Sequence, residues 1–147
     1  GLRDTAPLEP CGTDAEGHDI GLGRVGTVDE TTLGTFADHV ASVLPAGPSG
    51  LFVGGDELAS VRRVAVRGGA GDSALEAARA SRVDVYLTAD LRHHPASEHL
   101  EGGSPALLCG SHWATESPWL PVLARKIREA ARAADVEVRV EVSTIVT

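Results

Sequence analysis

The feature that most constrains this chain is its alternation between short apolar runs and stretches with helical periodicity. Strand-like runs lie at 61–67, 83–88 and 106–109. Between and around them, the spacing of apolar residues predicts helices at about 31–44, 72–81 and 118–134, with one or two further helical turns at 95–100. Strands alternating with helices of this length predict an α/β layered fold with a mostly parallel central sheet and helices on both faces.

The same pattern predicts which side chains form the core. Six residues at the centres of the expected strands should be buried: Val64, Val66, Val85, Leu87, Leu107 and Leu108. The last predicted helix carries an apolar stripe that we expect to pack on these strands, formed by Leu123, Ile127 and Ala131.

The two ends of the chain differ in character. Residues 1–19 contain many turn formers and few periodic apolar residues, which is typical of a linker or an extended lead-in. We expect residues 20–147 to form a single α/β lobe. The turn formers at 45–50 end the first helix, and the alternation of apolar and polar residues at 136–146 predicts a final strand. Gly1 occupies the first position and the chain contains no Met, so we interpret it as a fragment or a processed piece.

Composition excludes several classes of function. The chain has 13 basic residues against 21 acidic ones, a formal charge of -8, which argues against nucleic acid as a main partner. No apolar run approaches the roughly 18 residues of a membrane span, so we expect no membrane association. Cys11 and Cys109 do not make a disulfide framework, and a cytoplasmic location is the expectation.

Two glycine-rich motifs have alternative interpretations. The run GLGRVG at 21–26 matches a dinucleotide-binding pattern, but it lacks a buried strand before it, which favours a closely packed glycine-rich strand. The run at 68–71 follows a predicted strand and precedes a helix. Gly68, Gly69 and Gly71 could therefore either line an anion site at the helix N-terminus or form a tight turn.

Polar residues follow two further predicted strands, where open α/β sheets place their ligands. Asp90 and His94 come after the strand at 83–88, and they could bind a metal, orient a ligand or carry protons, or simply be surface residues. His112 and Glu116 come after the strand at 106–109. If the chain turns helical at once, these two lie on one helix face and could ligate one metal, although two ligands do not complete a site.

Cys109 lies beside this second strand end. With His112 or His94 as its base it could act as a nucleophile, but a small buried apolar role is more typical of such a cysteine.

Taken in order, six motifs resemble the Nif-three-like family of dinuclear-metal proteins, often labelled GTP cyclohydrolase 1 type 2 homologs. They are GLGRVG, TLGTFADHV, VRRVAVRGGAG, TADLRHHPA, SHWATE and VSTIVT. The likeness runs from about Pro7 to Thr147 and covers the second lobe of the family's two-lobed α/β subunit.

The resemblance implies a toroidal, usually hexameric assembly of copies of the chain, with two divalent metal ions per subunit (Zn, Fe, Mn or Ni). A His-His pair and an Asp of the first lobe would hold the ions together with His112 and Glu116. Asp90 and His94 would line the same pocket and orient ligands or contact substrate. Three positions depart from the family pattern, because Ala89 and Ser111 replace glycines and Cys109 replaces an aspartate.

Three kinds of function stay open at this point. The chain could belong to a metal-dependent hydrolase of a heterocyclic or nucleotide-like substrate, to a non-enzymatic metal-binding ring or interaction scaffold, or it could be an inert α/β domain. Two ligands on one helical turn leave most of a coordination sphere to water. We therefore expect weak metal binding by this chain alone, and tight binding once the first lobe is present.

Overall fold

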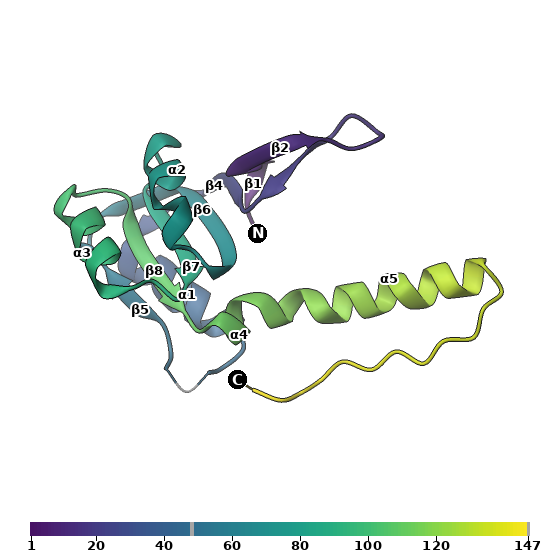
Figure 1. Ribbon diagram of the computed structural model, residues 1–147. Helices are drawn as coiled ribbons and strands as arrows, with labels where there is room; N and C mark the ends of the chain where they lie inside the picture. The colour runs from purple at the N-terminus through teal and green to yellow at the C-terminus, as the bar shows by residue number, and fades with distance from the viewer. Residues whose placement is uncertain (48, 147) are drawn as a thin grey trace.

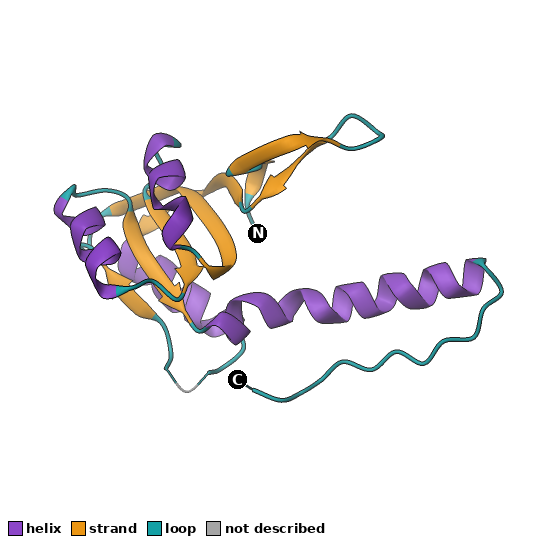
Figure 2. Ribbon diagram, viewed as in Figure 1, coloured by secondary structure: helices purple, strands orange, loops and turns teal. Residues whose placement is uncertain are grey.

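The computed structural model describes residues 1–47 and 49–146 (Figure 1). Pro48, within the expected interruption at 45–50, and Thr147, at the end of the last motif, lie outside the described residues. A layered α/β body contains most of the chain. A two-stranded hairpin and a long C-terminal arm project from this body (Figures 1 and 2).

The body is built on a six-stranded sheet with the order β1-β4-β6-β7-β8-β5. The strands are β1 (Arg3–Ala6), β4 (Arg24–Thr32), β5 (Phe52–Gly54), β6 (Ser60–Ala70), β7 (Val85–Ala89) and β8 (Ala106–Gly110). The central pairs β6–β7 and β7–β8 are parallel, whereas β1–β4, β4–β6 and β5–β8 are antiparallel. The α/β layered fold is confirmed, but the sheet is mixed rather than mostly parallel. The antiparallel pairs join strands that are separated in the chain by other elements, so the alternation of helices and strands along the sequence does not reveal them.

Helices cover both faces of this sheet. On one face lies α1 (Leu33–Val43), which begins after Thr32; the Thr32 side chain accepts a hydrogen bond from the Thr35 amide. On the other face lie α2 (Leu75–Ala80), preceded by the short 3-10 turn η1 (Asp72–Ala74), and α3 (His93–Glu101). Two apolar clusters result, one under α1 and one under α2 and α3.

The predicted strand core is confirmed. Val64, Val85 and Leu108 are fully buried, Leu87 and Leu107 nearly so, and Val66 packs half-buried against the α1 cluster. Side chains of successive residues point to opposite faces of the sheet: Val85 belongs to the α1 cluster, and the next residue, Tyr86, belongs to the cluster under α2 and α3.

The N-terminal residues differ from the expected linker. Strand β1 pairs with β4, and β2 (Glu9–Thr13) forms a hairpin with β3 (Asp19–Leu22). Arg67 of β6 binds Glu9 with an N–O distance of 2.8 Å and ties the hairpin to the body. The residues of β1 are all exposed, so this edge strand carries none of the apolar periodicity that marks buried strands.

The glycine-rich run at 21–26 belongs to β3 and β4, as the strand interpretation predicts. A Cβ on Gly21 would lie 2.2 Å from the Glu9 carbonyl oxygen, and one on Gly26 would lie 2.8 Å from that of Arg3. These glycines therefore allow neighbouring strands to approach closely.

The C-terminal arm contradicts two expectations. Helix α5 (Leu120–Ala133) extends away from the sheet, and Leu123 and Ile127 are 38% and 40% exposed instead of packing on the core (Figure 1). Both sheet faces are already covered by other helices. Residues 136–146 run back beside α5 without strand pairing to any described residue, although the Arg128 guanidinium donates to the Val140 carbonyl at 2.6 Å. An alternating pattern is typical of a strand, but it does not specify a free sheet edge with which that strand could pair.

Among the described residues, the search for a helix both long and apolar enough to cross a bilayer finds none.

Candidate metal centre

The site is centred on a five-residue helix that begins directly after β8. Helix α4 (His112–Glu116) is capped by Ser111, whose side chain accepts a hydrogen bond from the Ala114 amide at 3.1 Å. The departure from glycine at this position thus provides a favourable N-cap. The immediate helical turn places His112 and Glu116 on one face, as the sequence predicts.

The His112 imidazole lies between two carboxylates. Its Nδ1 is 2.7 Å from Oδ2 of Asp90, and its Nε2 is 3.1 Å from Oε2 of Glu116. The three side chains are each about half exposed, so the cluster opens to solvent.

This arrangement requires a proton or another cation between the imidazole Nε2 and the Glu116 carboxylate. If Nδ1–H donates to Asp90, a neutral ring turns the lone pair of Nε2 toward the Glu116 carboxylate, and the two electron-rich atoms repel each other. A proton on Nε2 or a cation between the two atoms removes this repulsion. Consistently, the hydrogen bond with Asp90, together with the charges of Glu116 and Asp90, raises the pKa of His112 against the opposing effect of burial.

Asp90 reaches His112 because of an unusual backbone conformation at the end of β7. Its φ is +51°, in the left-handed region that Asp tolerates better than most residues. Ala89, where the resemblance leads us to expect a glycine, is fully buried in β7, and the left-handed conformation falls on the residue after it. The alanine is therefore accommodated.

The glycines at 68–71 form a wall of the site. Strand β6 continues to Ala70, so Gly68 and Gly69 end a strand rather than open a helix. A Cβ on Gly69 would lie 2.4 Å from Oε1 of Glu116 and 3.3 Å from Cε1 of His112, and the φ of Gly69 is +71°. The positive φ favours glycine at this position, and any side chain there would displace the end of the Glu116 side chain.

Backbone amides at these glycines are already occupied. The Gly69 amide donates to Oγ1 of Thr115 at 3.0 Å, and the Gly71 amide donates to the Ala89 carbonyl at 3.1 Å. These two amides are therefore not free to bind an anion, and a role for the glycines in ligand binding stays a prediction.

His94 is placed differently from the other candidates. It is an exposed residue of α3, and its ring centroid lies 5.3 Å from that of His93. Within the described part of the chain, no hydrogen bond or ion pair joins His94 to Asp90, His112 or Glu116. A role for His94 at the site remains a prediction.

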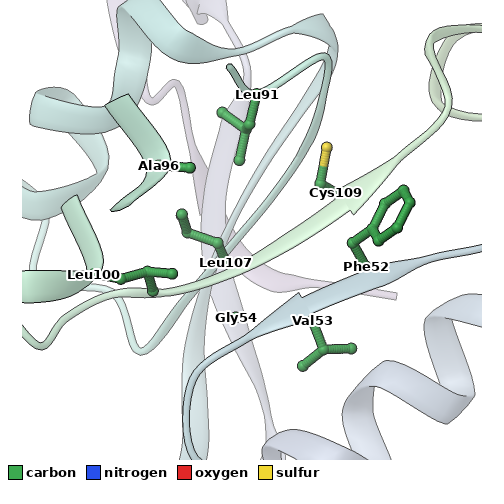
Figure 3. A pocket seen from close by; sticks show the side chains of 8 residues that line it. All are labelled: Phe52, Val53, Gly54, Leu91, Ala96, Leu100, Leu107 and Cys109. Atoms are coloured by element: carbon green, nitrogen blue, oxygen red, sulfur yellow. The ribbon is translucent and has the colours of Figure 1, made fainter. Parts of the chain in front are cut away.

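Cys109 lies in a separate apolar cavity of about 210 Å³. Figure 3 shows its thiol among carbon side chains from β5, β8 and α3; the cavity is lined by Phe52, Val53, Gly54, Leu91, Ala96, Leu100, Leu107 and Cys109. Among the described residues that line this cavity there is no histidine, so the surroundings favour the apolar interpretation of Cys109 over the nucleophile.

Sequence reasoning missed two participants near the site and one other group. Thr88 donates to the Gly69 carbonyl and Thr115 accepts from the Gly69 amide, and only the place of Thr88 within a strand and of Thr115 within SHWATE could have indicated this. Asp14, Glu16 and His18 gather at the tip of the β2–β3 hairpin, with potential ligand atoms within 4.8 Å of one another. There the Asp14 carboxylate accepts the amides of the other two and closes the turn.

Known proteins with similar sequences share a family description. A protein of Streptomyces coelicolor named GTP cyclohydrolase 1 type 2 homolog is 46% identical over 147 residues, covering 99% of this chain and 51% of that protein. A protein of the same name from Mycobacterium leprae is 49% identical over 102 residues, covering 69% of this chain and 26% of the relative. The chain thus spans about half the length of the Streptomyces coelicolor relative. Its match to the Mycobacterium leprae relative covers 26% of that protein.

A solved structure supports the same relationship. The Bacillus cereus protein related to NIF3 superposes with a TM-score of 0.81 at 31% identity, covering 89% of this chain and 35% of the other. The profile of the family described as Duf34/NIF3 (NGG1p interacting factor 3) matches residues 1–147. With the whole chain matched, this protein belongs to the Duf34/NIF3 family.

Proposed function

We propose that this chain is the metal-binding lobe of a dinuclear-metal-dependent hydrolase, with His112 and Glu116 as metal ligands. The observation that carries the proposal is the pair His112 Nε2 and Glu116 Oε2, which face each other at 3.1 Å on a single helical turn. The names of the relatives support a cyclohydrolase-type reaction, since they are called GTP cyclohydrolase 1 type 2 homologs.

The donor atoms fit a divalent ion. Imidazole nitrogen and carboxylate oxygen bind Zn and similar ions at about 2.0–2.2 Å. Two such ligands on one ion lie about 2.8–3.6 Å apart for octahedral or tetrahedral angles. The observed distance of 3.1 Å falls in this interval. Zn, Fe, Mn and Ni all accept this combination of ligands.

Asp90 would orient the imidazole. By accepting the Nδ1–H proton at 2.7 Å it selects the tautomer whose Nε2 lone pair is free to bind a metal. Paired ions, when bound, would supply Lewis-acid activation of a water molecule and a clamp for an anionic substrate group. The chain's own residues would hold the ions, orient His112 and, through Gly69, shape one wall of the site.

Two ligands do not complete a dinuclear centre. We propose that the remaining ligands come from the rest of a longer protein, since the Streptomyces coelicolor relative is about twice as long as this chain. We also propose that copies of the longer protein associate into a ring. A ring with closed symmetry needs complementary surface patches on each copy. The exposed apolar residues of α5 support an interface on the arm.

Metal content tests this function directly. The full-length protein, purified without chelator, should contain divalent metal by elemental analysis. The single changes His112→Ala and Glu116→Ala should each reduce that content while circular dichroism stays unchanged. A matched control is His39→Ala, at an exposed position of α1, which should leave the metal content intact. Full metal content in both site variants would refute the assignment.

Turnover separates the hydrolase from the non-enzymatic ring. The metal-loaded protein should open heterocyclic or nucleotide-like substrates, and the His112→Ala variant should not. A metal-loaded protein without any metal-dependent turnover across such substrates would favour the ring or scaffold function instead.

A further inference from the structure

Helix α4 is five residues long and continues through a 3-10 turn (Ser117–Trp119) into α5, which extends away from the sheet (Figure 1). The long helix that follows therefore does not hold α4 against the sheet. The orientation of His112 and Glu116 therefore depends on what holds this turn against the end of β6.

The Thr115 hydroxyl supplies one such connection. Its Oγ1 accepts the Gly69 amide at 3.0 Å and donates to the His112 carbonyl at 3.0 Å. One side chain, placed between the two candidate ligands in sequence, thus links the backbone of α4 to the end of β6.

The connection continues into β7. The Gly69 carbonyl accepts a hydrogen bond from Oγ1 of Thr88 at 3.1 Å, and Thr88 is fully buried. Two residues after Thr88, Asp90 binds the His112 imidazole at 2.7 Å. The result is a closed circuit that runs from Thr88 through Gly69 and Thr115 to His112, and back through Asp90.

We propose that Thr115 is a positioning residue, which fixes His112 and Glu116 relative to Asp90 by bridging Gly69 and the His112 carbonyl. This inference rests on the proposed metal centre for its consequence, but the circuit itself consists of the chain's own groups. Gly69 contributes from the other side, because any side chain there would meet the Glu116 carboxylate. The site would thus be held by a threonine hydroxyl and shaped by a missing Cβ.

The test compares Thr115→Val with Thr115→Ser in the full-length protein. Valine has nearly the same shape but cannot make either hydrogen bond, whereas serine retains the hydroxyl. Removing an outer partner of a metal ligand typically reduces metal affinity about 10- to 100-fold. We expect Thr115→Val to show such a loss in a titration with Zn²⁺, and Thr115→Ser to restore most of it. Thr13→Val, an exposed strand position in the hairpin, is the matched control.

A second readout needs no metal. In the metal-free protein, the ¹⁵N chemical shifts of the His112 ring report its tautomer and its Nδ1 hydrogen bond to Asp90. We expect these shifts to change in Thr115→Val and to return in Thr115→Ser, with unfolding measured in parallel to identify a variant that has not folded. In the event of a misfolded valine variant, Thr115→Ala and Thr88→Val interrupt the same circuit.

The outcomes distinguish this inference from the proposed function. Wild-type protein that binds no Zn²⁺ would refute the metal centre, and the ring shifts would still decide the positioning role. A folded Thr115→Val with wild-type affinity and unchanged ring shifts would overturn the role of Thr115. Loss of affinity in Thr115→Val without recovery in Thr115→Ser would also overturn it, because the hydroxyl would then not be the cause.

Discussion

Replacing Gly71 by alanine should destabilise the protein strongly, because the new Cβ would overlap with the side chain of Thr88. The new Cβ would lie 1.9 Å from Oγ1 of Thr88 and 2.6 Å from both carbon atoms Cβ and Cγ2 of that residue. The backbone of Gly71 has φ -113° and ψ 2°, which alanine can adopt, so the cost is steric rather than conformational.

Neither partner can move easily. Thr88 is fully buried in β7, and three hydrogen bonds hold the Gly71 backbone: its amide donates to Ala89, and its carbonyl accepts from Ala74 and from the hydroxyl of Tyr86. Relief of the overlap requires a displacement of about 1.5 Å to reach van der Waals contact, and overpacking of this kind costs about 1–3 kcal/mol of stability. Loss of one of the hydrogen bonds adds about 1 kcal/mol. We expect Gly71→Ala to lower the free energy of unfolding by about 2–4 kcal/mol.

Urea denaturation followed by circular dichroism measures this effect. The matched control is Gly34→Ala in α1, where the new Cβ makes ordinary contacts of 3.4 and 3.5 Å with Glu57 and should stabilise the helix by about 0.5–1 kcal/mol. A double-mutant cycle with Thr88→Gly removes the opposing atoms and should recover more than about 1 kcal/mol of coupling. A loss below about 1 kcal/mol for Gly71→Ala, or strictly additive effects in the cycle, would refute the reasoning.

Three further predictions follow from packing, titration and ligand number. Leu33→Ala, at a fully buried position under the sheet, should cost about 2–5 kcal/mol in urea unfolding; Leu123→Ala on α5 should cost clearly less in the same assay, and equal costs would contradict the placement of the arm. Burial lowers the pKa of His99, which lies against the Pro105 carbonyl and Arg79 and near Glu76. The unfolded chain therefore binds a proton at His99 more readily than the folded protein does. The free energy of unfolding should fall as the pH drops from about 6.5 through the lower folded pKa. Urea midpoints that fall as much in His99→Gln as in the wild type would contradict this. The chain of 147 residues alone should bind Zn²⁺ weakly and release it to a mild chelator; nanomolar affinity by calorimetry that persists in His18→Ala would mean that Asp90 or His94 is a ligand.

Local pattern was enough to predict the strands that make the core and the relationship of His112 to Glu116. Burial of Val64, Val85 and Leu108 follows from apolar runs at strand length, and two residues four apart share a face in any helix. The position of the site after strand ends also followed from sequence, because parallel strands bring their carboxyl ends to one edge.

Contacts between distant segments were beyond the reach of sequence patterns. The hydrogen bond from His112 to Asp90 needs a left-handed conformation at Asp90, and the link through Thr115 and Thr88 needs the end of β6 to lie between β7 and α4.

The direction of α5 and the pairing of the last residues likewise depended on tertiary structure. The amphipathic pattern of α5 specifies which face is apolar, and the alternation at 136–146 specifies an extended chain, but neither specifies the surface that receives it. In this chain α1, α2 and α3 already cover the sheet, so the arm extends outward with Leu123 and Ile127 partly exposed. Periodicity is a property of neighbouring residues, whereas burial is decided by which surfaces remain free once the rest of the chain has packed.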